Sequence, residues 1–169
     1  IGKAGSGKDT VADYLNDIYG FRKYSFAAAL KAEVAEMWPE VYKTNPRHLL
    51  QKYGADCRDK YGADYWIDKL FQTIPFDEQF IVITDCRYEN EYDRCLAEGF
   101  TPVKIQCDDS IRSGRLWMRD GRQMTPEELM HKSEQLNVPC SYYLDNNGTF
   151  SQLYEQIEKM ICDMRGEGE

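Results

Sequence analysis

The sequence predicts an α/β protein, a three-layer sandwich in which helices cover both faces of a central parallel sheet. Three observations lead to this fold class. A glycine-rich stretch, residues 1–10, runs directly into an amphipathic helix. Residues 80–84 (FIVIT) form a continuously apolar strand, as expected of a strand buried on both faces. Around them, strand-like and helix-like segments alternate, which is the order of a sheet built from βαβ units.

The first half of the chain is expected to hold one short strand and several helices. Helical spacing of apolar residues continues from the opening stretch to Gly20, where the helix ends. A strand is expected at residues 21–26 and a helix at residues 27–38, which Pro39 stops. Residues 45–74 are predicted to be helical in two pieces, broken around Gly62.

The second half alternates strands and helices more regularly. Thr149 and Gln152 cap its last helix, which turns Leu153, Ile157 and Met160 toward the core. The predicted elements are strands at residues 80–84, 101–107 and 141–144, and helices at residues 90–98, at residues 110–120, from residue 125 and from residue 150.

Composition narrows the classes of function. With 169 residues we expect a single domain, residues 1–169, with a first strand lying upstream of Ile1. The formal net charge of -8 argues against a DNA- or RNA-binding surface, although it allows small anions. Six scattered cysteines without a C-x-x-C pattern argue against zinc and match the reduced thiols of a cytosolic protein. No apolar run reaches transmembrane length.

The opening stretch carries the pattern G-x-x-x-x-G-K from Gly2 to Lys8, the start of the phosphate-binding P-loop motif. Backbone N–H groups can surround a polyphosphate only where no side chain intervenes, and glycine permits the positive φ angles of such a loop. Lys8 would reach the β- and γ-phosphates, and the helix after it points its positive end at the same anion. The alternative is a glycine-rich turn before a helix, which the correctly placed lysine argues against.

One position departs from this motif. The residue after Lys8 normally carries a hydroxyl group that binds Mg²⁺, but here it is Asp9, and the hydroxyl follows at Thr10. Asp9, Thr10 and Asp85 are therefore the candidate magnesium ligands, partly through water. The polyphosphate-binding residues predicted in the loop are Gly5, Ser6, Gly7, Lys8, Asp9 and Thr10.

Asp85 and Arg87 follow the apolar strand. Ligands of parallel sheets sit beyond the carboxyl ends of the strands, so we expect the glycine-rich loop, Asp85 and the turns at residues 108–109 and 146–147 to share one rim. In a functional interpretation Asp85 orients magnesium-bound water or the acceptor, and Arg87 contacts a phosphate. In the structural alternative Asp85 is a strand-end carboxylate paired with a neighbouring arginine.

Arginines form the densest basic group of this acidic chain between residues 112 and 122. Their spacing of three or four places them on one face of a continuing helix, where they repel one another unless anions lie between them. A lid that closes over a transferred phosphoryl group needs such a face, with Arg115 and Arg119 as the catalytic candidates. The alternative is a solvated face neutralised by nearby aspartates. The four residues are Arg112, Arg115, Arg119 and Arg122.

The helical middle segment and a later tetrapeptide supply further polar candidates. Stacking on a base requires an aromatic ring, reading a base edge suits an amide, and binding a monophosphate suits an arginine. For any single residue here, packing or surface exposure is the competing explanation, above all for Trp66. The candidates are Arg47, Gln51, Arg58, Tyr61 and Trp66, followed by His131 and Glu134.

Taken together, these residues resemble the phage-type deoxynucleoside monophosphate kinases. The matching stretches follow one another along nearly the whole chain. They are residues 7–10 (GKDT), 25–27 (SFA) followed by Leu30 and Lys31, 46–51 (PRHLLQ) with Gly54, Arg58 and Trp66, 84–91 (TDCRYENE), 131–134 (HKSE) and 146–149 (NNGT).

The resemblance implies an adenylate-kinase-like P-loop fold, Mg²⁺, ATP as donor and a deoxynucleoside monophosphate as acceptor. It implies that a helical region at about residues 39–75 binds the acceptor, that the region at about residues 108–135 closes as a lid, and that Asn146 lies near the adenine of ATP. The acceptor-binding residues it implies are Lys31, Arg47, Gln51, Arg58, Trp66, Arg87 and Glu134.

We therefore predict ATP-dependent phosphorylation of a nucleoside or deoxynucleoside monophosphate. Two alternatives remain at this level: a P-loop kinase for another small phosphorylated acceptor, of the phosphomevalonate or dephospho-coenzyme A type, and a nucleotide-dependent switch. Neither N-K-x-D nor D-x-x-G after the apolar strand is present, which argues against the switch. We expect no nucleic acid or membrane partner and a cytoplasmic location, the host cytoplasm for a phage protein. A homodimer is compatible with the sequence.

Overall fold

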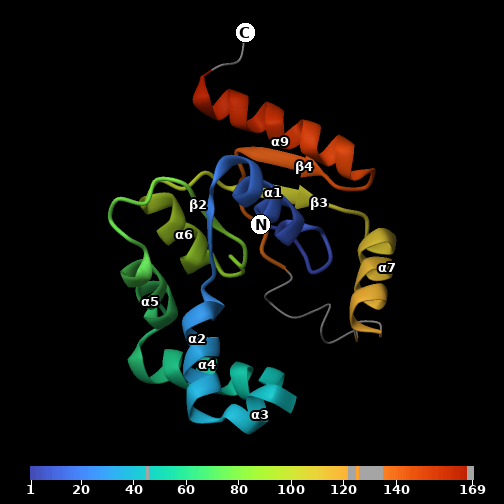
Figure 1. Ribbon diagram of the computed structural model, residues 1–169. Helices are drawn as coiled ribbons and strands as arrows, with labels where there is room; N and C mark the ends of the chain where they lie inside the picture. The colour runs from blue at the N-terminus through green and yellow to red at the C-terminus, as the bar shows by residue number, and fades with distance from the viewer. Residues whose placement is uncertain (45, 122–124, 126–134, 167–169) are drawn as a thin grey trace. The chain divides into compact units, whose positions relative to one another are not determined.

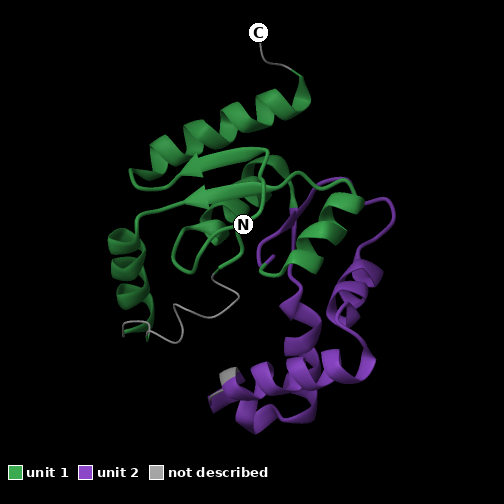
Figure 2. Ribbon diagram, turned by 180° about the vertical axis from the view of Figure 1, so that it is seen from behind, with its two compact units in different colours: residues 1–21, 87–169 green, residues 22–86 purple. Residues whose placement is uncertain are grey.

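The computed structural model describes residues 1–44, 46–121, 125 and 135–166, in which helices alternate with short strands (Figure 1). The chain divides into two compact units (Figure 2). One unit comprises residues 1–21 and 87–169, and the other comprises residues 22–86. The glycine-rich loop and the arginine-rich helix both belong to the first unit.

The first unit is built around two parallel strands. β3 (Val103–Gln106) pairs with β4 (Tyr142–Asp145), with Val103 opposite Tyr142 and Gln106 opposite Asp145. In both ribbon views α9 runs along β4 (Figures 1 and 2). The helices of this unit are α1 (Lys8–Tyr19), α6 (Glu89–Ala97), α7 (Asp109–Asp120) and α9 (Phe150–Arg165).

Ile1 extends this arrangement on the other side of β3. Its amino group donates to the Val103 carbonyl at 2.7 Å, and the Ile105 N–H donates to the Ile1 carbonyl at 2.8 Å. This alternation of donor and acceptor around one residue is that of a parallel pair. The loop therefore leaves directly from backbone that is fixed against β3.

The core of the first unit lies between α9, the strands and α1. Leu153 and Ile157 are fully buried and Met160 is 3% exposed, which confirms the predicted inner face of α9. The helix begins at a capping box, in which the Gln152 N–H donates to the Thr149 hydroxyl, as the sequence predicts. Leu15 of α1 is also buried, so α1 is anchored to the same core.

A pair of tyrosines joins the two outer helices of this core. Tyr14 and Tyr19 of α1 both donate to the carboxylate of Glu158 on α9, at 2.6 and 2.5 Å. Tyr14 also stacks on Tyr154, with ring centroids 4.2 Å apart. The helix that follows the loop is thus attached to α9 by polar as well as apolar contacts.

The second unit is mostly helical. β1 (Arg22–Tyr24) pairs in parallel with β2 (Ile81–Ile83), with Arg22 opposite Ile81 and Tyr24 opposite Ile83. The helices between them are α2 (Ala27–Met37), α3 (Pro39–Thr44), α4 (Pro46–Tyr61) and α5 (Tyr65–Thr73). Val34, Trp66, Ile67 and Leu70 form its core. The predicted break around Gly62 is confirmed, because α4 ends at Tyr61 and α5 begins at Tyr65.

Some details differ from the sequence-based expectations. Pro39 ends α2 but also begins α3, since proline fits the first turn of a helix. Met37 is 45% exposed although helical spacing places it with Val34. Instead of one central sheet, the described residues form two parallel pairs, one in each unit. Among these residues β1 is the single strand that pairs with β2, and the side chains of β2 are half-buried on both faces. The helix expected from residue 125 lies outside the described residues.

Two other expectations concern the chemistry of the whole chain. All six cysteines are free thiols. Among the described residues, no helix is long and apolar enough to cross a membrane.

Candidate functional site: the glycine-rich loop

The loop before α1 has the backbone conformation that the motif predicts. Gly2, Gly5 and Gly7 have φ angles of 154°, 78° and 97°, in the region that side chains disfavour. Gly7 is the N-cap of α1, which begins at Lys8. The N–H groups of the first helical turn, which have no partner within the helix, and the positive end of the helix dipole therefore face the loop, which suits an anion.

Space as well as conformation requires glycine here. A Cβ atom on Gly2 would lie 2.8 Å from the Ile105 carbonyl oxygen, and one on Gly5 would lie 2.8 Å from the Arg112 carbonyl oxygen. A Cβ atom on Gly7 would lie 2.1 Å from Nδ2 of Asn146. The loop is consequently packed against β3, against α7 and against the turn that follows β4.

Arg112 forms the contact with α7. This arginine is only 5% exposed; its Nε donates to Asp109 Oδ1 at 2.6 Å and its Nη1 donates to the Ala4 carbonyl at 3.4 Å. Its guanidinium, with a smaller contribution from Lys3, lowers the pKa of the Asp109 carboxyl. The charge of Arg112 is therefore balanced by Asp109, and its guanidinium supports the loop by bonding to the Ala4 carbonyl.

Asn146 forms the contact with the turn after β4. It is 3% exposed, its Nδ2 donates to the Ser6 carbonyl at 2.8 Å, and its N–H donates to the Gln106 carbonyl at 2.8 Å. Nη2 of Arg115 lies 3.0 Å from the Asn146 carbonyl oxygen and 3.4 Å from Oδ1. Asn146 is thus fixed between α7 and the loop, whereas the family resemblance implied only proximity to adenine.

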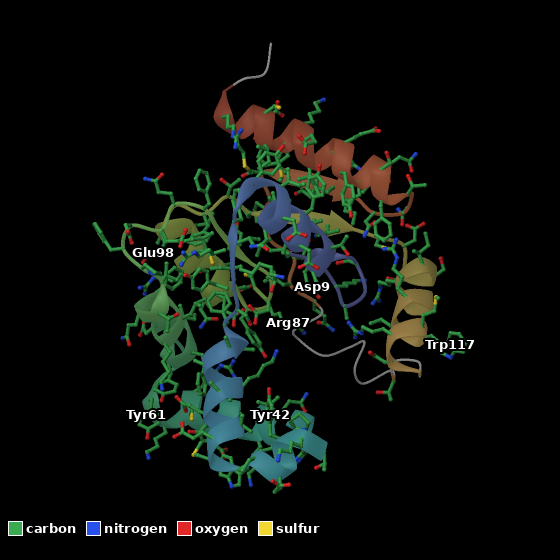
Figure 3. The ribbon with its side chains drawn as sticks, viewed as in Figure 1. Asp9, Tyr42, Tyr61, Arg87, Glu98 and Trp117 are labelled. Carbon is green, nitrogen blue, oxygen red and sulfur yellow. The ribbon has the colours of Figure 1, made fainter. Side chains whose placement is uncertain are left out.

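The ionic and hydroxyl groups of the loop lie at the start of α1. Nζ of Lys8 donates to the Lys3 carbonyl at 3.0 Å, across the loop. Asp9 is exposed in the first turn of α1 (Figure 3), and Thr10 is half-buried. The hydroxyl oxygen of Ser6 is buried without a hydrogen-bond partner among the described residues. A buried hydroxyl with no protein partner is costly, so the loop suits a ligand that supplies one.

Arg119 lies nearer the end of α7 and is more accessible than Arg112. Its Nε and Nη2 donate to both oxygens of Asp120, at 2.6 and 2.8 Å, and its side chain is 62% exposed. Asp120, and more weakly Asp9, raise the pKa of the Arg119 guanidinium. The electrostatic contribution of Asp9 links Arg119 to the first turn of α1. The fourth arginine of the predicted row, Arg122, lies outside the described residues.

Asp85 belongs to the second unit and has structural partners there. Its carboxylate accepts from the Ser25 hydroxyl at 2.7 Å, from the Phe26 N–H at 2.8 Å and from the Ala27 N–H at 3.0 Å. These bonds cap the N-terminus of α2. The structural alternative for Asp85 was an ion pair with a neighbouring arginine. The structure instead shows three hydrogen bonds from the residues at the start of α2.

The predicted acceptor residues are spread over both units. Arg58, half-buried on α4, donates from Nη1 to the Gly54 carbonyl at 3.3 Å, and Trp66 donates from Nε1 to the same carbonyl at 3.1 Å. Trp66 is 2% exposed, so in this structure it packs in the core, which was the alternative to a base-stacking role. Lys31 and Gln51 are exposed.

Arg87 belongs to the first unit. Its side chain is half-buried, and its backbone N–H donates to Oε2 of Glu91 at 2.7 Å, before α6. The side chain of Arg47 and all of His131 and Glu134 lie outside what the structure describes. The contacts of Asn146 and Arg112 with the loop were not predicted from the sequence. The spacing of Asp109 and Arg112, three residues apart, was the one local signal for the second.

The oxygen atoms beside the loop suit a Mg²⁺ ion that is held mainly by water and by substrate phosphates. Among the described residues, no group of three His, Cys, Asp or Glu side chains could hold a metal ion. Mg²⁺ commonly keeps several waters and binds one or two protein groups plus substrate phosphates. Asp9 and Thr10, beside the loop, can supply that small number of oxygen ligands.

No family model matches the chain, but it resembles known proteins in sequence and in structure. The chain is 29% identical, over an alignment of 193 residues, to a protein of Acanthamoeba polyphaga mimivirus named "Putative deoxynucleotide monophosphate kinase". The alignment covers 93% of this chain and 91% of that protein. The structure also resembles TT1252 from Thermus thermophilus, with a TM-score of 0.60 over 96% of this chain and 94% of that one. At 19% sequence identity, the second likeness shows a shared fold.

Proposed function

We propose that this protein transfers the γ-phosphoryl group of ATP to a deoxynucleoside or nucleoside monophosphate. The observation that carries the proposal is the loop at residues 2–8, whose three positive-φ glycines lead into the N-terminus of α1. The likeness to a mimivirus protein named for a deoxynucleotide monophosphate kinase, along 93% of the chain, supports the choice of reaction. A phosphate-binding loop alone would serve a kinase or a switch equally well.

The donor phosphates occupy the loop in this proposal. Backbone N–H groups of Gly5 and Gly7 and of the first turn of α1 surround them, while the Ser6 N–H donates to the Lys3 carbonyl at 3.1 Å within the loop. Lys8 exchanges its own bond to the Lys3 carbonyl for a phosphate oxygen. The Ser6 hydroxyl gains an acceptor that it lacks among the described residues. Mg²⁺, held by Asp9 or Thr10, would neutralise charge on the donor phosphates.

Transfer of the phosphoryl group needs positive charge around its equatorial oxygens. We favour Arg119 of the two predicted catalytic arginines, because the ion pair that it forms with Asp120 is exposed, and exposed pairs are weak. Arg115 would have to leave Asn146 to reach a phosphate. Asp85 is proposed to act through α2, whose N-terminus it fixes.

The acceptor is assigned to the helical region and to the polar residues around it. Lys31 and Gln51 are accessible for a monophosphate and a base, and Arg58 can exchange a weak bond at 3.3 Å for a phosphate. Trp66 supports the position of Gly54 from the core. Arg47, Arg87 and Glu134 complete the proposed acceptor set.

A coupled assay with ATP, Mg²⁺ and a panel of monophosphates tests this function. The panel contains the deoxynucleoside and ribonucleoside monophosphates, with phosphomevalonate and dephospho-coenzyme A as competing acceptors. We expect turnover of at least one nucleoside monophosphate and of neither competitor. Turnover of a competitor only, or of no acceptor, would contradict the proposal.

Lys8→Ala is the matched loss-of-function variant. We expect it to lower kcat/KM by about 100-fold or more, because the charge that stabilises the donor phosphates is removed. The control is Lys104→Ala, whose ammonium group donates to Asn137 at 3.2 Å in the same unit. Circular dichroism of both variants shows whether the fold is retained. Full activity of Lys8→Ala would mean that the loop is not the donor site.

A further inference from the structure

Both ends of the Asn146 side chain amide are engaged by protein groups. Oδ1 lies 3.4 Å from Nη2 of Arg115, and Nδ2 donates to the Ser6 carbonyl at 2.8 Å. The same guanidinium group holds the Asn146 backbone carbonyl at 3.0 Å. Because Asn146 is only 3% exposed, little of its surface is left for a ligand.

The bond to Ser6 sets the orientation of one peptide group of the loop. In a trans peptide the carbonyl and the following N–H point in opposite directions. Asn146 holds the Ser6 carbonyl on its own side, so the Gly7 N–H points away from Asn146. The chain has no cis peptide bond among its described residues, and no acceptor for the Gly7 N–H is found among them. The Gly7 N–H is therefore held in one orientation and can still donate a hydrogen bond to a ligand.

Asn146 also fills the space that a side chain at position 7 would need. A Cβ atom on Gly7 would lie 2.1 Å from Nδ2, well inside the contact distance of the two atoms. The bare backbone of Gly7 and the amide of Asn146 thus fit one another. A replacement at either position changes the path of the loop.

We propose that Asn146 is a positioning residue for the phosphate loop. It holds the Ser6–Gly7 peptide so that the Gly7 N–H faces the bound triphosphate, and it contacts neither the phosphates nor the base itself. Arg115 keeps the amide in this orientation. The inference rests on the proposed donor site and changes the role of Asn146 from contact with the nucleobase to control of loop shape.

Asn146→Asp is the sharpest variant, because it keeps the size of the side chain and an oxygen for Arg115. It replaces the donor to Ser6 with a second oxygen, so two acceptors face each other at about the former hydrogen-bond distance. The probe is inorganic tripolyphosphate, which has the phosphates of ATP but no base or sugar. We expect its affinity and that of ATP to fall together, by about 10- to 100-fold, in isothermal titration.

The matched control is Asn16→Asp at the other end of α1. Asn16 Nδ2 also donates to a backbone carbonyl, that of Phe21, at 2.7 Å, so the chemical change is the same. We expect this variant to bind tripolyphosphate and ATP like the wild type. Asn146→Ala, which removes the bond without opposing two oxygens, should weaken both ligands by a smaller factor. This second variant keeps the test decisive where Asn146→Asp fails to fold.

The outcomes separate this inference from the proposed function. Weaker ATP binding with unchanged tripolyphosphate binding would show that Asn146 acts on the nucleoside, and would overturn the inference. Unchanged binding of both ligands would overturn it too, even with kinase turnover intact. Parallel loss of both affinities supports the inference, including in a protein that phosphorylates no monophosphate.

Discussion

Gly7→Ala should lower the free energy of unfolding by about 2–3 kcal/mol, for two separable reasons. Gly7 has a φ angle of 97°, and a residue with a Cβ atom pays roughly 1–2 kcal/mol in this region. The new Cβ would lie 2.1 Å from Nδ2 of Asn146, so that side chain must leave the Ser6 carbonyl. Loss of a buried hydrogen bond costs about 1 kcal/mol more.

Gly20→Ala separates these two reasons. Gly20 caps the other end of α1 with a φ angle of 74°, but nothing lies within 4 Å of its added Cβ. It should therefore show the conformational cost alone, roughly 1–2 kcal/mol, in urea unfolding with linear extrapolation. In an Asn146→Ala background, Gly7→Ala should cost no more than Gly20→Ala. Equal costs of the two glycine substitutions in the wild-type background would refute the assigned contact.

Substitutions at three further positions test contacts outside the loop. Glu158→Gln should let Tyr19 ionise at lower pH in an absorbance titration, because hydrogen bonding to Glu158 raises the pKa of Tyr19 to about 12. The contribution of this raised pKa to the stability of the fold is complete below the ordinary tyrosine pKa of 10.0 and is lost as the pH rises toward 12. Asp85→Ala should lower the unfolding free energy in urea by about 2 kcal/mol, since three donors at the start of α2 lose a charged acceptor, and Asp85→Asn should lower it less. Leu153→Ala, at a fully buried position, should lower it by about 3–4 kcal/mol and reduce the thermal midpoint in calorimetry. An unchanged tyrosine titration would contradict the assigned role of Glu158. A urea midpoint equal to that of the wild type would contradict the assigned role of Asp85 or of Leu153, whichever residue was replaced.

Local sequence signals were enough to predict the loop and several of the helix ends. Glycine spacing, a lysine six positions after Gly2 and an amphipathic stretch depend only on neighbouring residues, and the structure has the predicted glycine conformations. Gly20 and Gly121 end their helices in the left-handed conformation for the same local reason. The capping box at Thr149 is likewise a contact over three residues.

The partners of the site residues could not be predicted in this way. Asn146 meets Ser6 across 140 positions of sequence, and Arg115 meets Asn146 across 31. No periodicity encodes such contacts, because they depend on how β4 and α7 pack beside the loop. Trp66 shows the same limit, since an aromatic residue of a helix is equally compatible with a base-stacking face and with a core position. Burial, which decides between them, is a property of the assembled unit.

The arginines of α7 share a helix but differ in what they can do. Arg112 and Leu116 are 5% and 3% exposed and pack against Ala4 and Gly5, so this part of α7 is a fixed support of the loop. Beyond Leu116 the helix surface is open: Trp117 is 58% exposed (Figure 3), and the side chain of Arg119 is 62% exposed. Arg112 and Arg115 thus contact the loop and Asn146, and Arg119 is the more accessible arginine of this helix. The lid at about residues 108–135 stays a prediction, because residues 122–124 and 126–134 lie outside the described part of the chain.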